Sequence, residues 1–293
     1  MNIDKPAGFT SADVLRRLKK LLPKKNKIGH LGTLDPMATG VLPVALGNAT
    51  RIISLMEKNR KRYLAGMCLG GVSDTEDAWG HVTLTGRSDF AISALEGILQ
   101  GFTGQIEQVP PMYSALHHQG RRLYDLARRG QVVERAPRKV NIYRLTLLDI
   151  NLTGTLPEIK IDVSCSPGTY IRSLCRDIGE QLGAGAYMNS LRRLEDGPFG
   201  IDGAVALETL LSGEQELQKV LLPVDYPLGD WPLYRLQNDQ EENCLWHGRS
   251  LAVDYYENIP QLRIHNRQGE LAGIGRIEVG HGQAWLIPLR VFH

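Results

Sequence analysis

The fifteen residues from Gly29 to Pro43 constrain the fold of this chain more than any other stretch. They read GHLGTLDPMATGVLP and include three glycines and two prolines. Their only charged side chain, unless His30 is protonated, is Asp35. The segment just before them, from Arg16 to Lys27, carries seven basic residues and no acid. A single carboxylate therefore follows a strongly positive segment.

The pattern leaves two interpretations of Asp35 open. An Asp before a Pro commonly starts a turn, because the carboxylate caps the turn and proline fixes the next backbone dihedral. This does not explain the apolar neighbours, among which an isolated carboxylate is costly unless it is paired or used in chemistry. Asp35 is thus either a turn former or a functional carboxylate. The apolar neighbours are Leu31, Leu34, Met37, Val41 and Leu42.

Length and composition indicate a globular chain of two domains. With 293 residues, 42% of them apolar, it can bury a sizeable core. The four cysteines are widely spaced and form no Cys-x-x-Cys pair, which argues against a zinc ribbon and a disulfide framework. No apolar run approaches the roughly 18 to 20 residues of a membrane span, and the first ten residues lack the apolar core of a signal peptide. We expect a cytoplasmic protein without membrane association.

The charge distribution is more informative than the net charge of +2. Residues 1–64 hold thirteen Lys and Arg against four acids, while residues 224–293 hold six against nine. A basic excess of this size indicates a polyanionic partner, because each phosphate that Lys or Arg neutralises releases condensed counterions. A solvated helix face is the alternative, and the charges alone do not separate the two.

Local patterns predict an α+β chain. Thr10 and Asp13 form a capping-box-like start for a helix from about Ser11 to Leu22, which Pro23 ends. The run from Leu222 to Pro232 has three prolines and one glycine, so we place a domain boundary there. The last sixty or so residues alternate in short segments typical of a small antiparallel barrel. Further helices are predicted at about 48–58, 89–100, 169–182 and 204–212, and strands at 138–150 and 158–165.

The central stretch resembles the catalytic motif of the TruB family of tRNA pseudouridine synthases, in which the Asp of GxLDPxATG is the catalytic residue. The resemblance recurs, in the family's order, over about residues 1 to 200. The other stretches that carry it are DKPAGFTS, KRY, LGGVSDTEDAWG, VPPMYSALHHQGRRLYDLARRG, GTYIRSLCRDIG and AYMNSLRRLEDGPF.

The resemblance implies three catalytic residues. Asp35 would be the catalytic carboxylate, and Arg172 of the GTYIR motif would pair with it, because a nearby positive charge favours the ionised form. Arg172 falls near a helix start, where the dipole disfavours a cation, so an anion close by is expected on physical grounds too. Tyr63 of the KxY motif would stack on the target uracil and is a candidate base. A half-buried strand residue is the alternative for Tyr63.

The same motifs imply a substrate-binding set. Lys5 would pack near the active-site loop, and His30 would lie at the flipped nucleotide unless it only caps the glycine turn. Asp77 would support the cleft, Tyr170 would pack over the site, and Leu191 would line the uracil pocket, a role compatible with a core position. The acids in the stretch around Asp77 superficially suggest a calcium loop, but the EF-hand glycine and bidentate Glu are missing, so no metal is expected.

Basic residues are interleaved with aromatic ones between Val109 and Arg129, a composition that suits a surface tracking a nucleic-acid backbone. An amphipathic helix with a wet basic face is the alternative. His117 stands where the family has Lys, and a histidine need not be charged at neutral pH. The expected RNA contacts are Lys19, Lys20, Arg121, Arg122 and Arg192, with Arg193 also near the RNA.

The resemblance implies a pseudouridine synthase fold: a central mixed, largely antiparallel sheet flanked by helices, with a small β-rich PUA-like domain at the C-terminus. Residues 1–222 would form the catalytic domain, with an RNA-gripping insert at about 80–138, and residues 233–293 the PUA-like domain. The implied reaction isomerises uridine 55 in the T arm of tRNA after base flipping. It requires no cofactor. A monomer without a guide RNA is expected.

Two other function classes stay open at this point. A non-catalytic RNA-binding protein or tRNA folding chaperone would keep the basic surface without the chemistry, and the retention of Asp35, Tyr63 and Arg172 counts against it. A nucleoside hydrolase would normally need a second carboxylate across the site, for which Asp77 is the only candidate.

Overall fold

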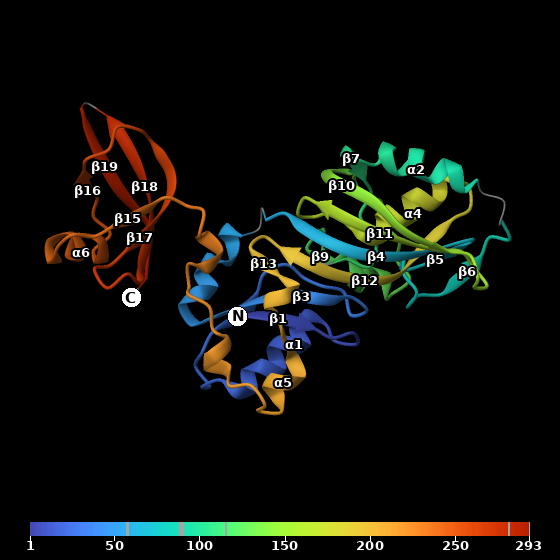
Figure 1. Cartoon of the computed structure of the whole chain (residues 1–293), viewed down its shortest axis with the longest axis horizontal. Coiled ribbons are helices and arrows are strands. Elements are labelled where there is room, and N and C mark those ends of the chain that lie inside the picture. The colour runs from blue at the N-terminus through green and yellow to red at the C-terminus, as the bar shows by residue number, and fades with distance from the viewer. Residues whose placement is uncertain (57–58, 88–90, 115, 281, 293) are drawn as a thin grey trace. The chain divides into compact units, whose positions relative to one another are not determined.

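The structure of the protein is a computed structural model that describes residues 1–56, 59–87, 91–114, 116–280 and 282–292. The chain divides into two compact units, which Figure 1 shows. The first comprises Met1–Ala45 and Ile52–Val220, and the second comprises Leu46–Arg51 and Leu221–His293.

The first unit is built on a ten-stranded sheet. Its main path runs β14-β1-β3-β12-β4-β11-β10-β7, while β2 pairs with β3 and β13 with β12. The pairs β1–β14 and β3–β12 are parallel, and the other pairs along the main path are antiparallel. The strands are β1 (Asn2–Lys5), β2 (Ile28–His30), β3 (Thr39–Leu46), β4 (Lys61–Leu69), β7 (Gly104–Gln108), β10 (Arg138–Asn151), β11 (Glu158–Cys165), β12 (Ala186–Asp196), β13 (Phe199–Gly200) and β14 (Val205–Ala206).

The middle of this sheet forms the core, and most side chains of its central strands are buried. In β11 the side chains of Ile159, Ile161 and Val163 are buried, while Lys160 between them is exposed. The strand pairs with β4, which contributes Met67 and Leu69 to the core and pairs in turn with β12. Because β12 pairs with β4 on one side and with the start of β3 on the other, these strands lie beside the loop that carries Asp35.

Helices pack at both ends of the sheet (Figure 1). The helices α1 (Ser11–Leu18) and α5 (Leu207–Leu211) contact each other near β1, whereas α2 (Ile92–Gly101) and α4 (Ile171–Gln181) contact each other near β10 and β12. The predicted capping box is present: Thr10 Oγ1 accepts from the Asp13 amide at 3.0 Å, and the Asp13 carboxylate accepts from the Thr10 amide at 3.0 Å. The helix predicted from about Ser11 to Leu22 is α-helical as far as Leu18 and continues as a 3-10 helix over Lys19–Leu21.

Two short hairpins and a short helix connect the longer elements of the first unit. A hairpin joins β5 (Gly71–Ser73) to β6 (Val82–Leu84), and a second joins β8 (His117–His118) to β9 (Arg121–Arg122) before the five-residue α3 (Leu123–Ala127). The helix expected over 48–58 is a 3-10 helix over Gly47–Leu55, and residues 57 and 58 lie outside the described residues, as do 88–90 at the expected start of α2.

The second unit holds a five-stranded sheet, in the order β15-β17-β18-β19-β16, together with α6 (Asp239–Trp246). Its core includes Leu236, Leu245, Leu262, Ile264 and Leu286. The pair β15–β17 is parallel, so the expectation of a wholly antiparallel barrel is wrong for that pair. The strands are β15 (Leu233–Arg235), β16 (Leu251–Val253), β17 (Ile259–His265), β18 (Leu271–Gly280) and β19 (Gln283–Val291).

The proline-rich run belongs to the second unit, and the side chain of its Asp225 contacts the sheet. Asp225 Oδ2 accepts from Arg263 Nη1 at 3.1 Å and lies 2.7 Å from His265 Nε2. Both partners lie on β17, and Arg263 also donates to Gly229 O and Trp231 O, so the run is held on the sheet by side-chain and backbone contacts. The predicted fold class, an α+β chain with a mixed, mainly antiparallel sheet and a β-rich C-terminal part, is confirmed. No helix among the described residues is long and apolar enough to cross a membrane.

Candidate active site

Asp35 lies in the loop between β2 and β3, and its side chain is 35% exposed. The loop returns to the sheet at Gly40, whose φ is +101° and where any Cβ would overlap the backbone of Arg193 on β12. A glycine is therefore required at this position, because a side chain would meet both a strained dihedral and a neighbouring strand. This close approach of β3 to β12 sets where the Asp35 loop leaves the sheet.

Arg172 is the main partner of Asp35. It lies in the first turn of α4, its side chain is only 4% exposed, and its Nε is 2.9 Å from Asp35 Oδ2. Within the described residues Nε makes no aligned hydrogen bond, so the contact is a close ion pair. The guanidinium also donates from Nη1 to Thr75 O at 2.9 Å and from Nη2 to Tyr113 O at 2.8 Å. These acceptors offset the cost of burying a cation at a helix N-terminus.

A second carboxylate, that of Asp77, lies 3.8 Å from Arg172 Nη1. Its Oδ1 accepts from Thr75 Oγ1 at 2.8 Å and from the Trp79 amide at 3.0 Å, and its side chain is only 10% exposed. The hydrogen bonds shape the loop between β5 and β6. Asp77 therefore joins that loop to Arg172 and is largely closed to solvent.

The neighbouring Glu76 is a structural anchor that sequence reasoning missed. It has a positive φ of +63°, accepts from Ser173 Oγ at 2.6 Å, and forms an ion pair with Arg176. Ser173 and Arg176 both lie on α4, the helix that carries Arg172. The sequence held one signal for this contact: Ser173 and Arg176 are three residues apart on a predicted helix, and residues at that spacing share a face.

Lys5 packs beneath the Asp35 loop and is completely buried. Its Nζ donates to Phe9 O at 2.6 Å, Pro6 O at 2.8 Å and Pro36 O at 3.4 Å. Burial lowers the pKa of Lys5 to about 8, although the nearby charge of Asp35 acts to raise it. The ammonium thus holds the turn that follows Asp35 and leaves no exposed surface for a substrate.

Arg193, which was expected to lie near the RNA, is also completely buried and therefore presents no surface for a direct RNA contact. Its Nε donates to Val41 O at 2.6 Å and its Nη2 to Gly32 O at 3.1 Å, which ties together the two ends of the Asp35 loop. Its Nη1 lies 3.5 Å from Asp196 Oδ2, which also accepts from Lys61 Nζ at 2.7 Å. The motif LRR did not indicate that Arg193 is buried, because two adjacent arginines are typical of a basic surface.

Tyr63 and His30 are both close to Arg193 and both tend to stay neutral. Burial raises the pKa of Tyr63 well above its ordinary value, and the Arg193 charge opposes this only in part. The phenol is therefore protonated. Burial lowers the pKa of His30, and the Arg193 charge lowers it further, so a neutral imidazole is favoured. Its Nδ1 has no hydrogen-bond partner within the described residues.

Two further residues of the expected substrate pocket are held by their backbones. Tyr170 exchanges two hydrogen bonds with the side chain of Gln108, at 2.8 and 3.0 Å, and burial raises the pKa of its phenol. Leu191 is buried on β12 opposite Ala65 of β4, and its carbonyl accepts from Thr39 Oγ1 at 3.5 Å.

The expected RNA contacts are spread over three surfaces. Lys19 and Lys20 are exposed on the 3-10 turn after α1. Arg192 is partly exposed, donates to Asp4 Oδ2 at 2.7 Å, and is thus already engaged in an ion pair. Arg121 and Arg122 are exposed on β9.

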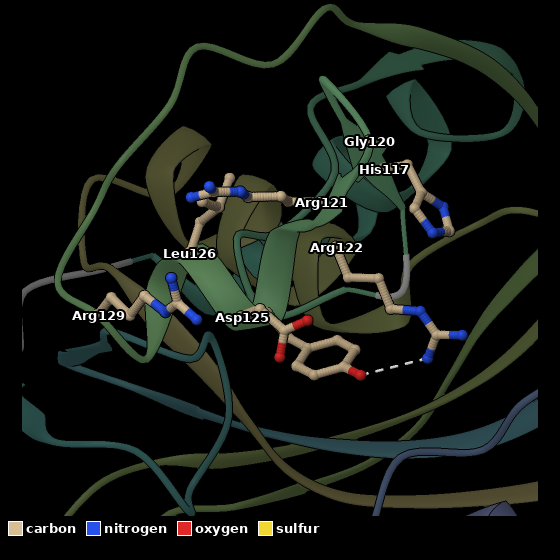
Figure 2. A pocket seen from close by; sticks show the side chains of 8 residues that line it. His117, Gly120, Arg121, Arg122, Asp125, Leu126 and Arg129 are labelled. Carbon is tan, nitrogen blue, oxygen red and sulfur yellow. Dashed lines mark hydrogen bonds between the residues drawn. The ribbon is translucent and has the colours of Figure 1, made fainter.

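The two β9 arginines line an open pocket of about 420 Å³ (Figure 2). Arg122 Nη1 donates to the Tyr124 hydroxyl at 3.2 Å, and the guanidinium carbons of Arg122 and Arg128 lie 5.8 and 5.5 Å from the centre of the Tyr124 ring. In Figure 2 His117 comes from the hairpin, whereas Asp125 and Arg129 come from the side of α3. Cations and an aromatic ring therefore meet in one pocket.

No group of three or more His, Cys, Asp or Glu in the described chain could hold a metal ion.

Two family models match the chain. "TruB family pseudouridylate synthase (N terminal domain)" matches residues 19–171, and "tRNA pseudouridylate synthase B C-terminal domain" matches residues 172–229. Among curated proteins, "tRNA pseudouridine synthase B" of Syntrophomonas wolfei is 46% identical over 100% of this chain and 97% of its own length. The protein of the same name from Clostridium acetobutylicum is 40% identical over 94% of each chain.

Solved structures support the same relationship. A chain of "Structure of H/ACA RNP bound to a substrate RNA containing 2'-deoxyuridine" matches with a TM-score of 0.73 and 26% identity, over 100% of this chain and 84% of its own. A chain of "Crystal Structure of a Cbf5-Nop10-Gar1 Complex" matches with a TM-score of 0.72 and 28% identity, over 100% and 83%. The fold is therefore the predicted pseudouridine synthase fold, and the chain belongs to the TruB family of pseudouridylate synthases.

Proposed function

We propose that this protein isomerises uridine 55 in the T arm of tRNA to pseudouridine. The observation that carries the proposal is the contact between a partly exposed carboxylate, Asp35, and a buried guanidinium, Arg172, in the loop that matches the family's catalytic motif. The near full-length relatives named tRNA pseudouridine synthase B support tRNA as the substrate. The T-arm position rests on the family resemblance.

In this reaction the bond between ribose C1′ and uracil N1 breaks, the base turns, and a bond forms between C1′ and C5. The C5 proton leaves, and N1 gains a proton. We assign Asp35 the role of the carboxylate that acts on the ribose or the base, because it is the exposed member of the Asp35–Arg172–Asp77 group. Arg172 compensates the charge of Asp35 and fixes its position.

We assign Tyr63 a packing role against the uracil. Its phenol keeps its own proton, because burial raises its pKa, so it is poorly suited to accept the C5 proton in this state. Tyr170 and Leu191 would complete the walls of the pocket. Flipping the uridine out of its stack costs a few kcal/mol, which phosphate contacts and stacking offset.

We assign the RNA contacts to Lys19, Lys20, Arg121, Arg122 and Arg192. Residues 1–222 would form the catalytic domain, with the insert at about 80–138 gripping the RNA, and residues 233–293 the PUA-like RNA-binding domain. A monomer without a guide RNA fits the resemblance of the insert to stand-alone bacterial enzymes. Asp77 supports a nucleoside hydrolase poorly, because it already accepts two hydrogen bonds and is nearly closed to solvent.

The test is release of tritium from tRNA labelled at uracil C5. The wild type should release the label, and Asp35→Asn should reduce release by at least 10³-fold while the tRNA affinity changes less than about threefold, since the carboxylate acts in the chemical step. Asp149→Asn, an exposed carboxylate on β10, is the matched control and should behave as wild type. Substantial turnover by Asp35→Asn would remove Asp35 from its role.

The position is tested with the same tRNA carrying cytidine in place of uridine 55. Release from the remaining uridines should vanish if position 55 is the target. Unchanged release would refute the T-arm assignment without affecting the assignment of Asp35.

A further inference from the structure

Trp79 is an exposed aromatic residue beside the candidate site that the proposed reaction leaves without a role. Its side chain is 59% exposed, in the loop between β5 and β6. Its indole N–H makes no hydrogen bond in the part of the chain that the structure describes. An exposed indole two residues from Asp77 presents a flat apolar face beside the candidate site, so Trp79 is a candidate contact surface.

The loop holds Trp79 in place with respect to the catalytic group. The Trp79 amide donates to Asp77 Oδ1 at 3.0 Å, and Asp77 Oδ2 lies 3.8 Å from Arg172, the partner of Asp35. The Ala78 amide donates to Met188 O at 2.8 Å, which adds a bond to β12 immediately before the indole. These bonds fix the backbone from which the indole projects, so the loop itself loses little conformational entropy on binding.

The charges of this loop favour a base over a phosphate as the contact. Glu76 is neutralised by Arg176 and Asp77 lies near Arg172, but Asp74 is exposed and has no ion pair among the described residues. A phosphate close to Asp74 would be repelled, whereas a base is uncharged. Aromatic side chains stack on any base, because every base presents a π-face.

We propose that Trp79 stacks on an unpaired base that flanks the target uridine and so positions the RNA strand while the uridine occupies the site. This inference rests on the proposed function, because the RNA is its substrate. The stack exists both before and during the chemical step. It therefore contributes to RNA affinity and KM and leaves kcat unchanged.

The first experiment compares Trp79→Ala, Trp79→Phe and a control, Leu148→Ala, in binding and turnover of tRNA. Leu148 is 52% exposed on β10, outside the insert assigned to RNA gripping, so the control removes exposed apolar surface without an aromatic ring. Trp79→Ala should raise Kd and KM about tenfold, which corresponds to about 1.4 kcal/mol, and change kcat less than twofold. Trp79→Phe should restore most of the affinity, and Leu148→Ala should match wild type.

The second experiment locates the base. RNAs with a single abasic nucleotide at successive positions around the target uridine are bound by wild type and by Trp79→Ala. At one position the ratio of the two Kd values should fall from about ten to about one, because the wild type then has no base to stack on. A ratio that stays near ten at every position would overturn the proposal, even if Trp79→Ala weakens binding.

The outcomes separate this inference from the proposed function. If the wild type converts and binds tRNA but Trp79→Ala has the wild-type Kd, the stacking proposal is wrong and a protein partner becomes the better explanation of the exposed indole. If the wild type neither binds nor converts tRNA, both proposals fail together. Unchanged thermal unfolding of both Trp79 variants shows that a loss of affinity does not come from loss of the fold.

Discussion

The proposed chemistry depends on a few charged side chains. Hydrogen bonds to backbone carbonyl oxygens fix these side chains in place as much as ion pairs do. Arg172 contacts Asp35, but it also donates to Thr75 O and Tyr113 O, which lie in two other loops. Lys5 donates to three carbonyls and has no carboxylate within salt-bridge distance among the described residues. Such contacts hold a cation at a defined place, which a flexible surface ion pair does not do.

Replacing Arg172 with lysine should separate geometry from charge. Lysine keeps the positive charge but cannot donate along two directions to Thr75 O and Tyr113 O while it also contacts Asp35. We expect kcat to fall at least tenfold, about 1.4 kcal/mol, with a smaller relative loss of thermal stability. Single-turnover tritium release and thermal unfolding measure the two effects. Arg144→Lys, an exposed ion-paired arginine on β10, is the control, and equal turnover by Arg172→Lys and wild type would contradict the paired site.

Lys5 gives a pH dependence with a defined sign. Its pKa is about 8 in the folded protein against an ordinary 10.5, so between these values the unfolded chain binds more protons than the folded one. Stability that depends on Lys5 therefore rises as the pH rises from about 8 toward 10.5, and its burial cost is fully present below pH 8. The difference in unfolding free energy between wild type and Lys5→Met should shift in favour of the wild type from about pH 7 to about pH 10. Denaturant unfolding at both pH values measures it, and a constant difference would refute the depressed pKa.

At the scale of elements, the site depends on how closely β3 approaches β12. Gly40 has both a positive φ and no room for a Cβ, and Arg193 from the same part of β12 bonds to Val41 O and Gly32 O. The loop that carries Asp35 is therefore fixed at both ends by one strand. A change in this contact should move Asp35 relative to α4, which carries Arg172.

Gly40→Ala tests this packing against a matched glycine. Gly213, after α5, has a positive φ of +80° but no atom within 4 Å of the position that a Cβ would occupy, so Gly213→Ala should cost only the ~1–2 kcal/mol of the dihedral. Gly40→Ala adds an overlap with backbone and should cost at least ~2 kcal/mol more, with loss of tritium release. Chemical denaturation gives both numbers. Equal destabilisation by the two variants would show that β3 can move away from β12 at no cost.

Local sequence patterns predicted the features that depend on neighbouring residues. They did not predict contacts between residues that are far apart in the sequence. The capping box at Thr10 and the position of Arg172 at a helix start follow from neighbouring residues, and the motif resemblance paired Arg172 with Asp35. The burial of Arg193 depends on strands far apart in the sequence, so the arginine pair looked like surface charge, whereas the resemblance placed Lys5 near the active-site loop, where it is buried. The raised pKa of Tyr63 likewise comes from burial, which no motif encodes.

At the scale of the whole molecule, the basic charge is concentrated in the first part of the chain. Residues 1–64 are strongly basic, and the exposed pair Arg121 and Arg122 extends positive charge into the insert. Residues 224–293 carry more acids than bases, so phosphate binding there is weaker per area of surface. The affinity for tRNA should therefore depend on salt mainly through the first unit.

The double variant Arg121→Gln, Arg122→Gln tests this division. Each lost phosphate contact lowers the slope of log K against log salt concentration by roughly 0.7 to 0.9, so the slope should fall by about 1.5 while kcat at saturating tRNA stays within twofold. The control Lys160→Gln, Lys219→Gln removes the same charge from exposed positions outside the proposed RNA contacts and should leave the slope unchanged. Filter binding at several salt concentrations measures both. If the two variants changed the slope equally, the net charge and not the pocket around Tyr124 would be steering the RNA, and the assignment of Arg121 and Arg122 would have to be withdrawn.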